Sequence, residues 1–105
     1  MIYKLFLDDE RFPAFTAYKE HIPWYVVRNV FDAMWVIKTY GLPWLMSLDH
    51  DLGYGKLTGM DFVKEYTNYL MDNNIHKKVS YYVHSMNPVG KLNIESYLDQ
   101  FYKEW

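Results

Sequence analysis

Four short apolar runs, each followed at once by polar residues, constrain the fold of this chain more than any other feature. They cover residues 2–7 (IYKLFL), 24–27 (WYVV), 44–48 (WLMSL) and 79–83 (VSYYV). Each run is rich in β-branched or aromatic residues, which are typical of strands. Their nearly continuous apolar character predicts burial on both faces, as in a parallel sheet.

Segments with helical spacing of apolar residues lie between and after these runs. We expect helices over residues 29–41, 58–74 and 93–105, each with one apolar face. The second opens with Thr58 and Asp61 at the spacing of a capping box. Alternating strands and helices imply parallel strands joined by right-handed crossovers, and therefore an α/β sandwich.

The connection between the first two runs, residues 8–23, differs from the others because it contains two prolines and only weak helical periodicity. We expect a loop there with about one helical turn, so the first crossover helix is degraded. With 105 residues the chain is long enough for one core, and we assign residues 1–105 to a single domain.

Composition excludes several classes of protein. No apolar run approaches the roughly 20 residues that cross a membrane, and the first residues do not resemble a signal segment, so we expect a soluble, cytoplasmic protein. Cysteine is absent, which rules out disulfides and thiol nucleophiles. The formal net charge is −2 without a basic run, which argues against an extended nucleic-acid surface but leaves room for a nucleotide or an RNA end.

Polar side chains follow every predicted strand, and the carboxyl ends of parallel strands meet at one edge of a sheet, where ligands bind. In chain order these residues are Asp8, Asp9, Glu10 and Arg11; Arg28 and Asn29; Asp49, His50 and Asp51; and His84, Ser85 and Asn87. Any one group is readily explained as a turn or a helix cap. Four such groups converging on one edge favour a functional site.

The chemistry that fits these residues is phosphate chemistry with a divalent cation. Carboxylates from Asp8 or Asp9 and from Asp49 or Asp51 would form a hard oxygen site for Mg²⁺ or Mn²⁺. Such an ion neutralises phosphate oxygens and polarises water.

Two histidines add acid–base chemistry to the predicted carboxylate site. His50 and His84 could divide the roles of general acid and base in opening a cyclic phosphodiester, and the sequence does not decide which takes which role. Four further side chains are candidate donors to phosphate oxygens: Arg11, Arg28, Ser85 and Asn87.

The motifs LFLDDER, LMSLD and YYVHS, in this order, resemble the receiver domains of two-component response regulators. More narrowly, LDDERFP, SLDHDLG and VHSMNPVG together resemble the divergent branch called the cyclic-phosphate processing receiver domain. The resemblance implies a receiver-like three-layer sandwich with about four parallel strands in the order 2-1-3-4. It also implies action on cyclic phosphate ends, including those met in RNA repair.

The resemblance further implies roles for single residues. Asp8 and Asp9 match the metal-binding acidic pair of receivers, and Ser85 matches their strand-four hydroxyl. Asp49 matches the phospho-accepting aspartate by its place at a strand end, although Asp51 has the more receiver-like distance to Gly59, so both registers stay open. Three residues match only the divergent branch: His50, His84 and Asn87.

One departure from ordinary receivers bears on function. Receivers end with a fifth strand carrying a lysine that contacts the phosphoryl group, whereas we expect no fifth strand here. That departure weakens the hypothesis of a stand-alone phospho-accepting switch using Asp49.

The leading hypothesis is a metal-dependent cyclic phosphodiesterase acting on a nucleotide or RNA terminus. A module that sequesters a nucleotide without turnover is the alternative from another class. A protein-interaction domain, suggested by the eleven tyrosines and four tryptophans, ranks below both.

Overall fold

Four parallel strands form the sheet that the apolar runs predict. The computed structural model describes residues 1–14 and 21–105. The strands are β1 (Lys4–Leu7), β2 (Trp24–Val27), β3 (Leu45–Leu48) and β4 (Ser80–Val83), in the order β2-β1-β3-β4. All three pairings are parallel, which confirms the predicted α/β class and strand order.

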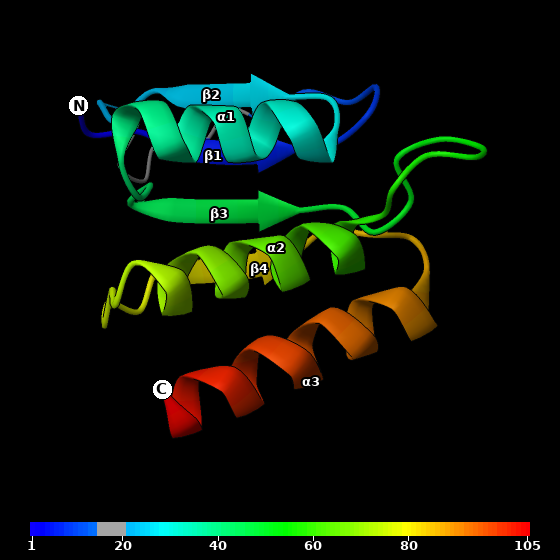
Figure 1. The fold of residues 1–105 in the computed structure, drawn as a ribbon. Coiled ribbons are helices and arrows are strands. Elements are labelled where there is room, and N and C mark those ends of the chain that lie inside the picture. Colours follow the sequence, from blue (N-terminus) through cyan, green and yellow to red (C-terminus); the bar gives the residue numbers. More distant parts are fainter. Residues whose placement is uncertain (15–20) are drawn as a thin grey trace.

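Three helices complete the described structure: α1 (Val30–Tyr40), α2 (Gly59–Asp72) and α3 (Pro88–Glu104). Thr58 and Asp61 form the predicted capping box, in which each side chain accepts the other residue's backbone N–H. In Figure 1, α1 lies over β1 and β2, and α3 runs beside α2.

The predicted start of the third helix, at Asn93, is wrong by one and a half turns. The helix begins at Pro88, because the Asn87 side chain accepts the N–H of Gly90 and proline suits the first helical position. The first turn exposes Val89 and Leu92 to solvent, so it lacks the apolar periodicity that marks the rest of the helix.

The core lies between the sheet and the helices. Leu5, Leu7, Met46 and Leu48 point toward the helices and join one buried cluster with residues of all three. The alternate residues Lys4, Phe6 and Ser47 point to the opposite face and are buried as well. β1 is therefore buried on both faces, as predicted.

The edge strand β4 departs from that prediction, because Ser80 and Tyr82 are exposed. An edge strand needs fewer apolar neighbours than a central one, so its aromatic residues do not imply burial on both sides.

The connection from β1 to β2 contains no helix in its described parts, residues 8–14 and 21–23. The predicted helical turn could therefore lie only in residues 15–20, which fall outside the described residues. The described chain contains no fifth strand, as the sequence led us to expect.

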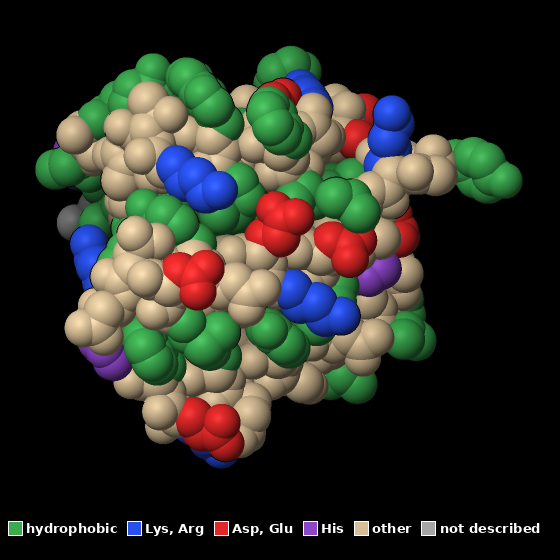
Figure 2. Space-filling model, in the orientation of Figure 1, with side chains coloured by type: hydrophobic (Ala, Val, Ile, Leu, Met, Phe, Trp, Pro, Cys, Tyr) green, Lys and Arg blue, Asp and Glu red, His purple; other side chains and the backbone are tan. Residues whose placement is uncertain are grey.

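No helix in the described part of the chain is both long enough and apolar enough to span a membrane. On the face shown in Figure 2, acidic and basic side chains are interspersed among hydrophobic ones rather than gathered by sign.

Candidate functional site

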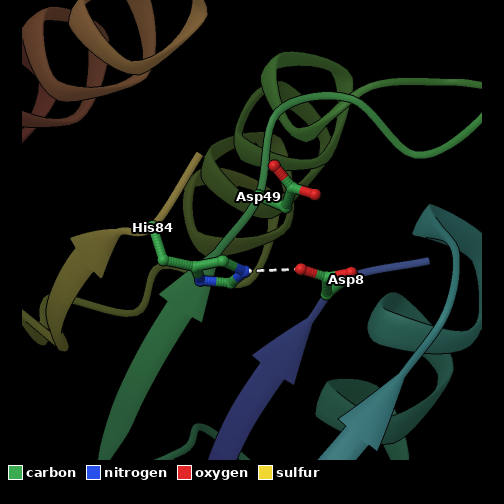
Figure 3. A group of neighbouring side chains, drawn as sticks. All are labelled: Asp8, Asp49 and His84. Atoms are coloured by element: carbon green, nitrogen blue, oxygen red, sulfur yellow. Dashed lines mark hydrogen bonds and ion pairs between the residues drawn. The ribbon is translucent and has the colours of Figure 1, made fainter. Parts of the chain in front are cut away.

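The first residue after each of three strands contributes to one cluster of polar side chains. Asp8, Asp49 and His84 follow β1, β3 and β4, and they offer ligand atoms that all lie within 4.8 Å of one another (Figure 3). Their backbone N–H groups extend the sheet ladder by one residue, bonding to Val27, Leu7 and Leu48 at 3.1, 2.9 and 2.9 Å. The sheet itself therefore sets their spacing.

Asp8 is fully buried, and both of its carboxylate oxygens are engaged. Oδ1 accepts the backbone N–H groups of Glu10 and Arg11 at 2.9 and 2.8 Å. Oδ2 accepts Nε of Arg11 at 2.8 Å and Nε2 of His84 at 2.9 Å. Burial acts to raise the pKa of Asp8, but these hydrogen bonds outweigh it and lower the pKa to about 2.

His84 is held at both ring nitrogens. Its Nε2 meets Asp8, and its Nδ1 lies 2.7 Å from the hydroxyl oxygen of Ser47 on β3. Because ionised Asp8 can only accept, Nε2 carries the hydrogen; in the neutral ring Nδ1 is then an acceptor, and Ser47 donates to it. Ser47, His84 and Asp8 are hydrogen-bonded in the same succession as a serine–histidine–aspartate triad. Ser47 is fully buried, however, and cannot reach a substrate as a nucleophile.

Arg11 bridges the two carboxylates of the cluster. Its Nε lies 2.8 Å from Asp8 Oδ2 and its terminal nitrogen 3.4 Å from Asp49 Oδ2, while 44% of its side chain remains exposed. Arg28 stabilises the loop after β1 by donating to the backbone carbonyls of Asp8 and Arg11. Its guanidinium also lies over the ring of Phe12.

A second group lies on the loop that follows β3. His50 Nδ1 is 2.9 Å from Asp51 Oδ1, and the Asn87 amide donates to Asp51 Oδ2 at 3.3 Å. The bond from His50 lowers the pKa of Asp51. Since Asp51 is then an acceptor, Nδ1 of His50 carries the hydrogen and Nε2 offers a lone pair.

Nε2 of His50 reaches the surface, although only 16% of the side chain as a whole is exposed. In the described part of the chain, Nε2 has no hydrogen-bond partner. Every buried side-chain nitrogen in that part has a partner, so Nε2 is not buried. The opposite side of the ring packs on Gly90, where a Cβ atom would overlap the imidazole. Gly90 in α3 therefore helps to fix the direction of the ring.

Glycine also fixes the backbone between the two groups. A Cβ atom at Gly59 would overlap the carbonyl oxygen of Asp49, and the Gly59 N–H donates to the His50 carbonyl at 2.7 Å. The His50 N–H in turn donates to Asp49 Oδ1 at 2.8 Å. The start of α2 thus presses directly against the site.

The sequence left open whether Asp49 or Asp51 takes the receiver-like position beside Asp8. In the structure Asp49 lies beside Asp8, whereas Asp51 lies beside His50. Asp9 is exposed, and its carboxylate lies near Gly53 on the loop after β3. Ser85 accepts the backbone N–H of Asn87 at 3.0 Å within a local turn. Asp9 is not a member of the Asp8–Asp49–His84 group.

Sequence reasoning missed Ser47, although a signal was present. Ser47 is the polar member of an otherwise apolar strand, and period-two alternation puts it on the face opposite Met46 and Leu48. A buried hydroxyl on that face needs a partner, and His84 supplies it.

Asp8, Asp49 and His84 can together hold a metal ion, since two carboxylates and an imidazole form a recognised donor set. The imidazole nitrogen favours Mn²⁺ over Mg²⁺, which prefers oxygen ligands. Coordination by His84 requires Nε2 to give up its hydrogen, and then Nδ1 can donate to Ser47 instead.

A protein-family model described as "Cyclic-phosphate processing Receiver domain" matches residues 3–100. No curated protein and no solved structure gives a significant match. The matched range includes every residue of both polar groups.

Proposed function

Because the chain belongs to the cyclic-phosphate processing receiver domain family, we propose that it hydrolyses a cyclic phosphodiester at a nucleotide or RNA terminus. The observation that carries this proposal is the arrangement of two neighbouring polar groups: a buried carboxylate pair formed where β1 and β3 end and, next to Asp49 on the loop after β3, a carboxylate-oriented histidine with a free nitrogen. The first group suits a phosphate-bound cation, and the second suits proton transfer.

Asp8 and Asp49 would hold the cation, Mg²⁺ or Mn²⁺, with His84 as a third ligand. When bound, the ion would neutralise phosphate oxygens and polarise water. The exposed Asp9 is not a member of this ligand set, and Asp51 is hydrogen-bonded to His50 instead.

We assign the role of general base to His50. Its Nε2 takes a proton from the attacking water as the oxygen of that water bonds to phosphorus. The bond from phosphorus to one ribose oxygen breaks, and that oxygen takes a proton from solvent, leaving a phosphate monoester. Asp51 orients the ring and stabilises its charged form, as the third member of a triad does.

His84 is a positioning residue or a ligand rather than the partner acid, because both of its nitrogens are engaged. Arg11 is the first candidate for a donor to the phosphate, since 44% of its side chain is exposed and its guanidinium lies beside the carboxylates. The polar groups of Arg28, Ser85 and Asn87 already make hydrogen bonds within the protein.

The test is hydrolysis of 2′,3′-cyclic nucleotides by the purified protein with Mn²⁺ or Mg²⁺, followed by phosphorus NMR. We expect a monoester product, formed roughly 10²–10⁴ times more slowly by His50→Ala, the usual range for a lost general base. His76→Ala is the matched control, because His76 stacks on Trp105 at the opposite end of α3 from Gly90. No product across the four bases with either metal would refute the proposal.

A binding module is the second candidate, favoured because the side chains of Asp8 and His84 are engaged by other groups of the protein, which leaves neither of them available as an acid or base. Calorimetry with the same cyclic nucleotides, followed by mass analysis, separates the two: a binder returns its ligand unchanged.

A further inference from the structure

Arg11 provides the positive charge between the two carboxylates of the candidate metal site. Its Nε contacts Asp8 Oδ2 at 2.8 Å, and its terminal nitrogen faces Asp49 Oδ2 at 3.4 Å. Both acids are buried, with exposed fractions of 0% and 5%, so each needs a positive partner or donors nearby. A guanidinium therefore sits against the same oxygens that would coordinate a cation.

The hydrogen bonds of Asp8 leave little room for both cations at once. Each carboxylate oxygen offers about two lone pairs, and the described donors to Asp8 already number two on Oδ1 and two on Oδ2. If His84 coordinates the ion, its hydrogen leaves Oδ2, but the Arg11 guanidinium still bridges Oδ2 of Asp8 and Oδ2 of Asp49, where its positive charge opposes a divalent cation.

Arg11 is the group better able to move. The two donors to Oδ1 are backbone N–H groups of the same loop, and His84 is fixed by Ser47 and by stacking on Phe6. The Arg11 side chain is long and 44% exposed, and the contacts that it makes with the described site residues come from its guanidinium.

We propose that Arg11 is the resident cation of this site: a divalent ion displaces its guanidinium from Asp8 and Asp49, and the released guanidinium then binds the substrate phosphate. The inference rests on the metal site of the proposed function. Arginine suits such an exchange, because its planar fork matches carboxylate and phosphate equally well.

The exchange makes cation binding and phosphate binding cooperative. Without a divalent ion, Arg11 is engaged by the carboxylates and the site as a whole repels an anion. With the ion bound, both obstacles are removed. By linkage, phosphate must then strengthen binding of the ion by the same factor.

The first test measures Mn²⁺ affinity by electron paramagnetic resonance, which needs no turnover. Arg11→Gln should bind Mn²⁺ about tenfold or more tightly than the wild type, because the ion no longer has to break a charge-assisted hydrogen bond. Arg28→Gln is the control: it removes an equal charge nearby, yet its described bonds go to backbone carbonyls, so Mn²⁺ affinity should change much less.

Equal or weaker Mn²⁺ binding by Arg11→Gln would overturn the inference, and so would an equal gain in Arg28→Gln, which would indicate charge alone. Absence of Mn²⁺ binding in all three proteins would overturn it too. Each outcome is independent of hydrolysis, so an inactive protein with the expected affinities refutes only the proposed function.

The second test is calorimetry with inorganic phosphate, with and without Mg²⁺. In the wild type Mg²⁺ should strengthen phosphate binding, and Arg11→Gln should lose most of that gain despite holding the ion better. An undiminished gain in Arg11→Gln would show that the guanidinium does not receive the phosphate. If Arg11→Gln does not fold without metal, Arg11→Lys keeps the charge but cannot bridge both acids, and it should show the same trends more weakly.

Discussion

The imidazole of His84 stacks on the ring of Phe6, with ring centroids 4.6 Å apart and planes inclined by 6°. Phe6 belongs to β1 and His84 follows β4, and β3 lies between these two strands. The imidazole therefore crosses the end of β3 to reach Asp8 (Figure 3). Ser47 on β3 holds its other nitrogen. The position of the ring depends on all three strands.

Ser47→Ala should destabilise the protein by roughly 1–3 kcal/mol, because it removes the donor to a partly buried ring nitrogen. Urea unfolding measures the free energy of unfolding. Ser80→Ala, on the exposed edge strand, should change it by less than about 0.5 kcal/mol. Equal effects of the two substitutions would contradict the assigned hydrogen bond.

Asp8 should make stability depend on acid pH. Its folded-state pKa, about 2, lies below the ordinary value of 3.8, so its contribution is present above pH 3.8 and is lost as the pH falls toward 2. Between about pH 5 and pH 2 the wild type should lose roughly 2 kcal/mol more than Asp8→Asn. Parallel pH profiles for the two proteins, from urea unfolding, would contradict this account.

Gly90→Ala should displace the imidazole of His50 while leaving α3 intact. Alanine favours a helix over glycine by about 1 kcal/mol, but its methyl group would overlap the ring. Once the bond to His50 is lost, the pKa of Asp51 should rise toward its ordinary value, which carbon NMR of the carboxyl group detects.

Ser96→Ala is the control for Gly90→Ala, because it places the same side chain on the exposed surface of α3. It should leave the pKa of Asp51 where it is. An unchanged pKa in Gly90→Ala as well would mean that the ring does not depend on this glycine.

Asp51→Asn should lower kcat for cyclic nucleotide hydrolysis by about 10²-fold or more, because the imidazole loses the group that sets its tautomer and stabilises its charge. The loss of kcat in the double variant Asp51→Asn and His50→Ala should be much smaller than the product of the two single losses, since both substitutions disable the same His50–Asp51 pair. Multiplicative losses in kcat would separate Asp51 from His50.

The sheet and most of the site could be predicted because both follow from one rule. Apolar runs followed by polar residues place Asp8, Asp49 and His84 at the carboxyl ends of parallel strands, and the structure brings these three together. The rule fixes where a side chain starts but not which atom it meets. The partition of Asp49 and Asp51 between two groups therefore could not be predicted.

Two other features escaped prediction for physical reasons. Apart from the buried Gly90, the first turn of α3 is exposed, so its helical state depends on the Asn87 cap and on Pro88 rather than on apolar spacing. The bridge from Arg11 to Asp49 joins residues far apart in sequence, and its geometry depends on how the loop after β1 turns back.

The backbone bonds of Asp8, Asp49 and His84 to neighbouring strands have a consequence for motion. Amide hydrogens in such a ladder exchange with solvent only when the strands separate, so these three should exchange about as slowly as the centre of the sheet. The acids and the histidine therefore form a stationary frame, made by the same cooperative unit that folds the domain. Against this frame, the guanidinium of Arg11 is free to change partners on the far faster timescale of a surface side chain.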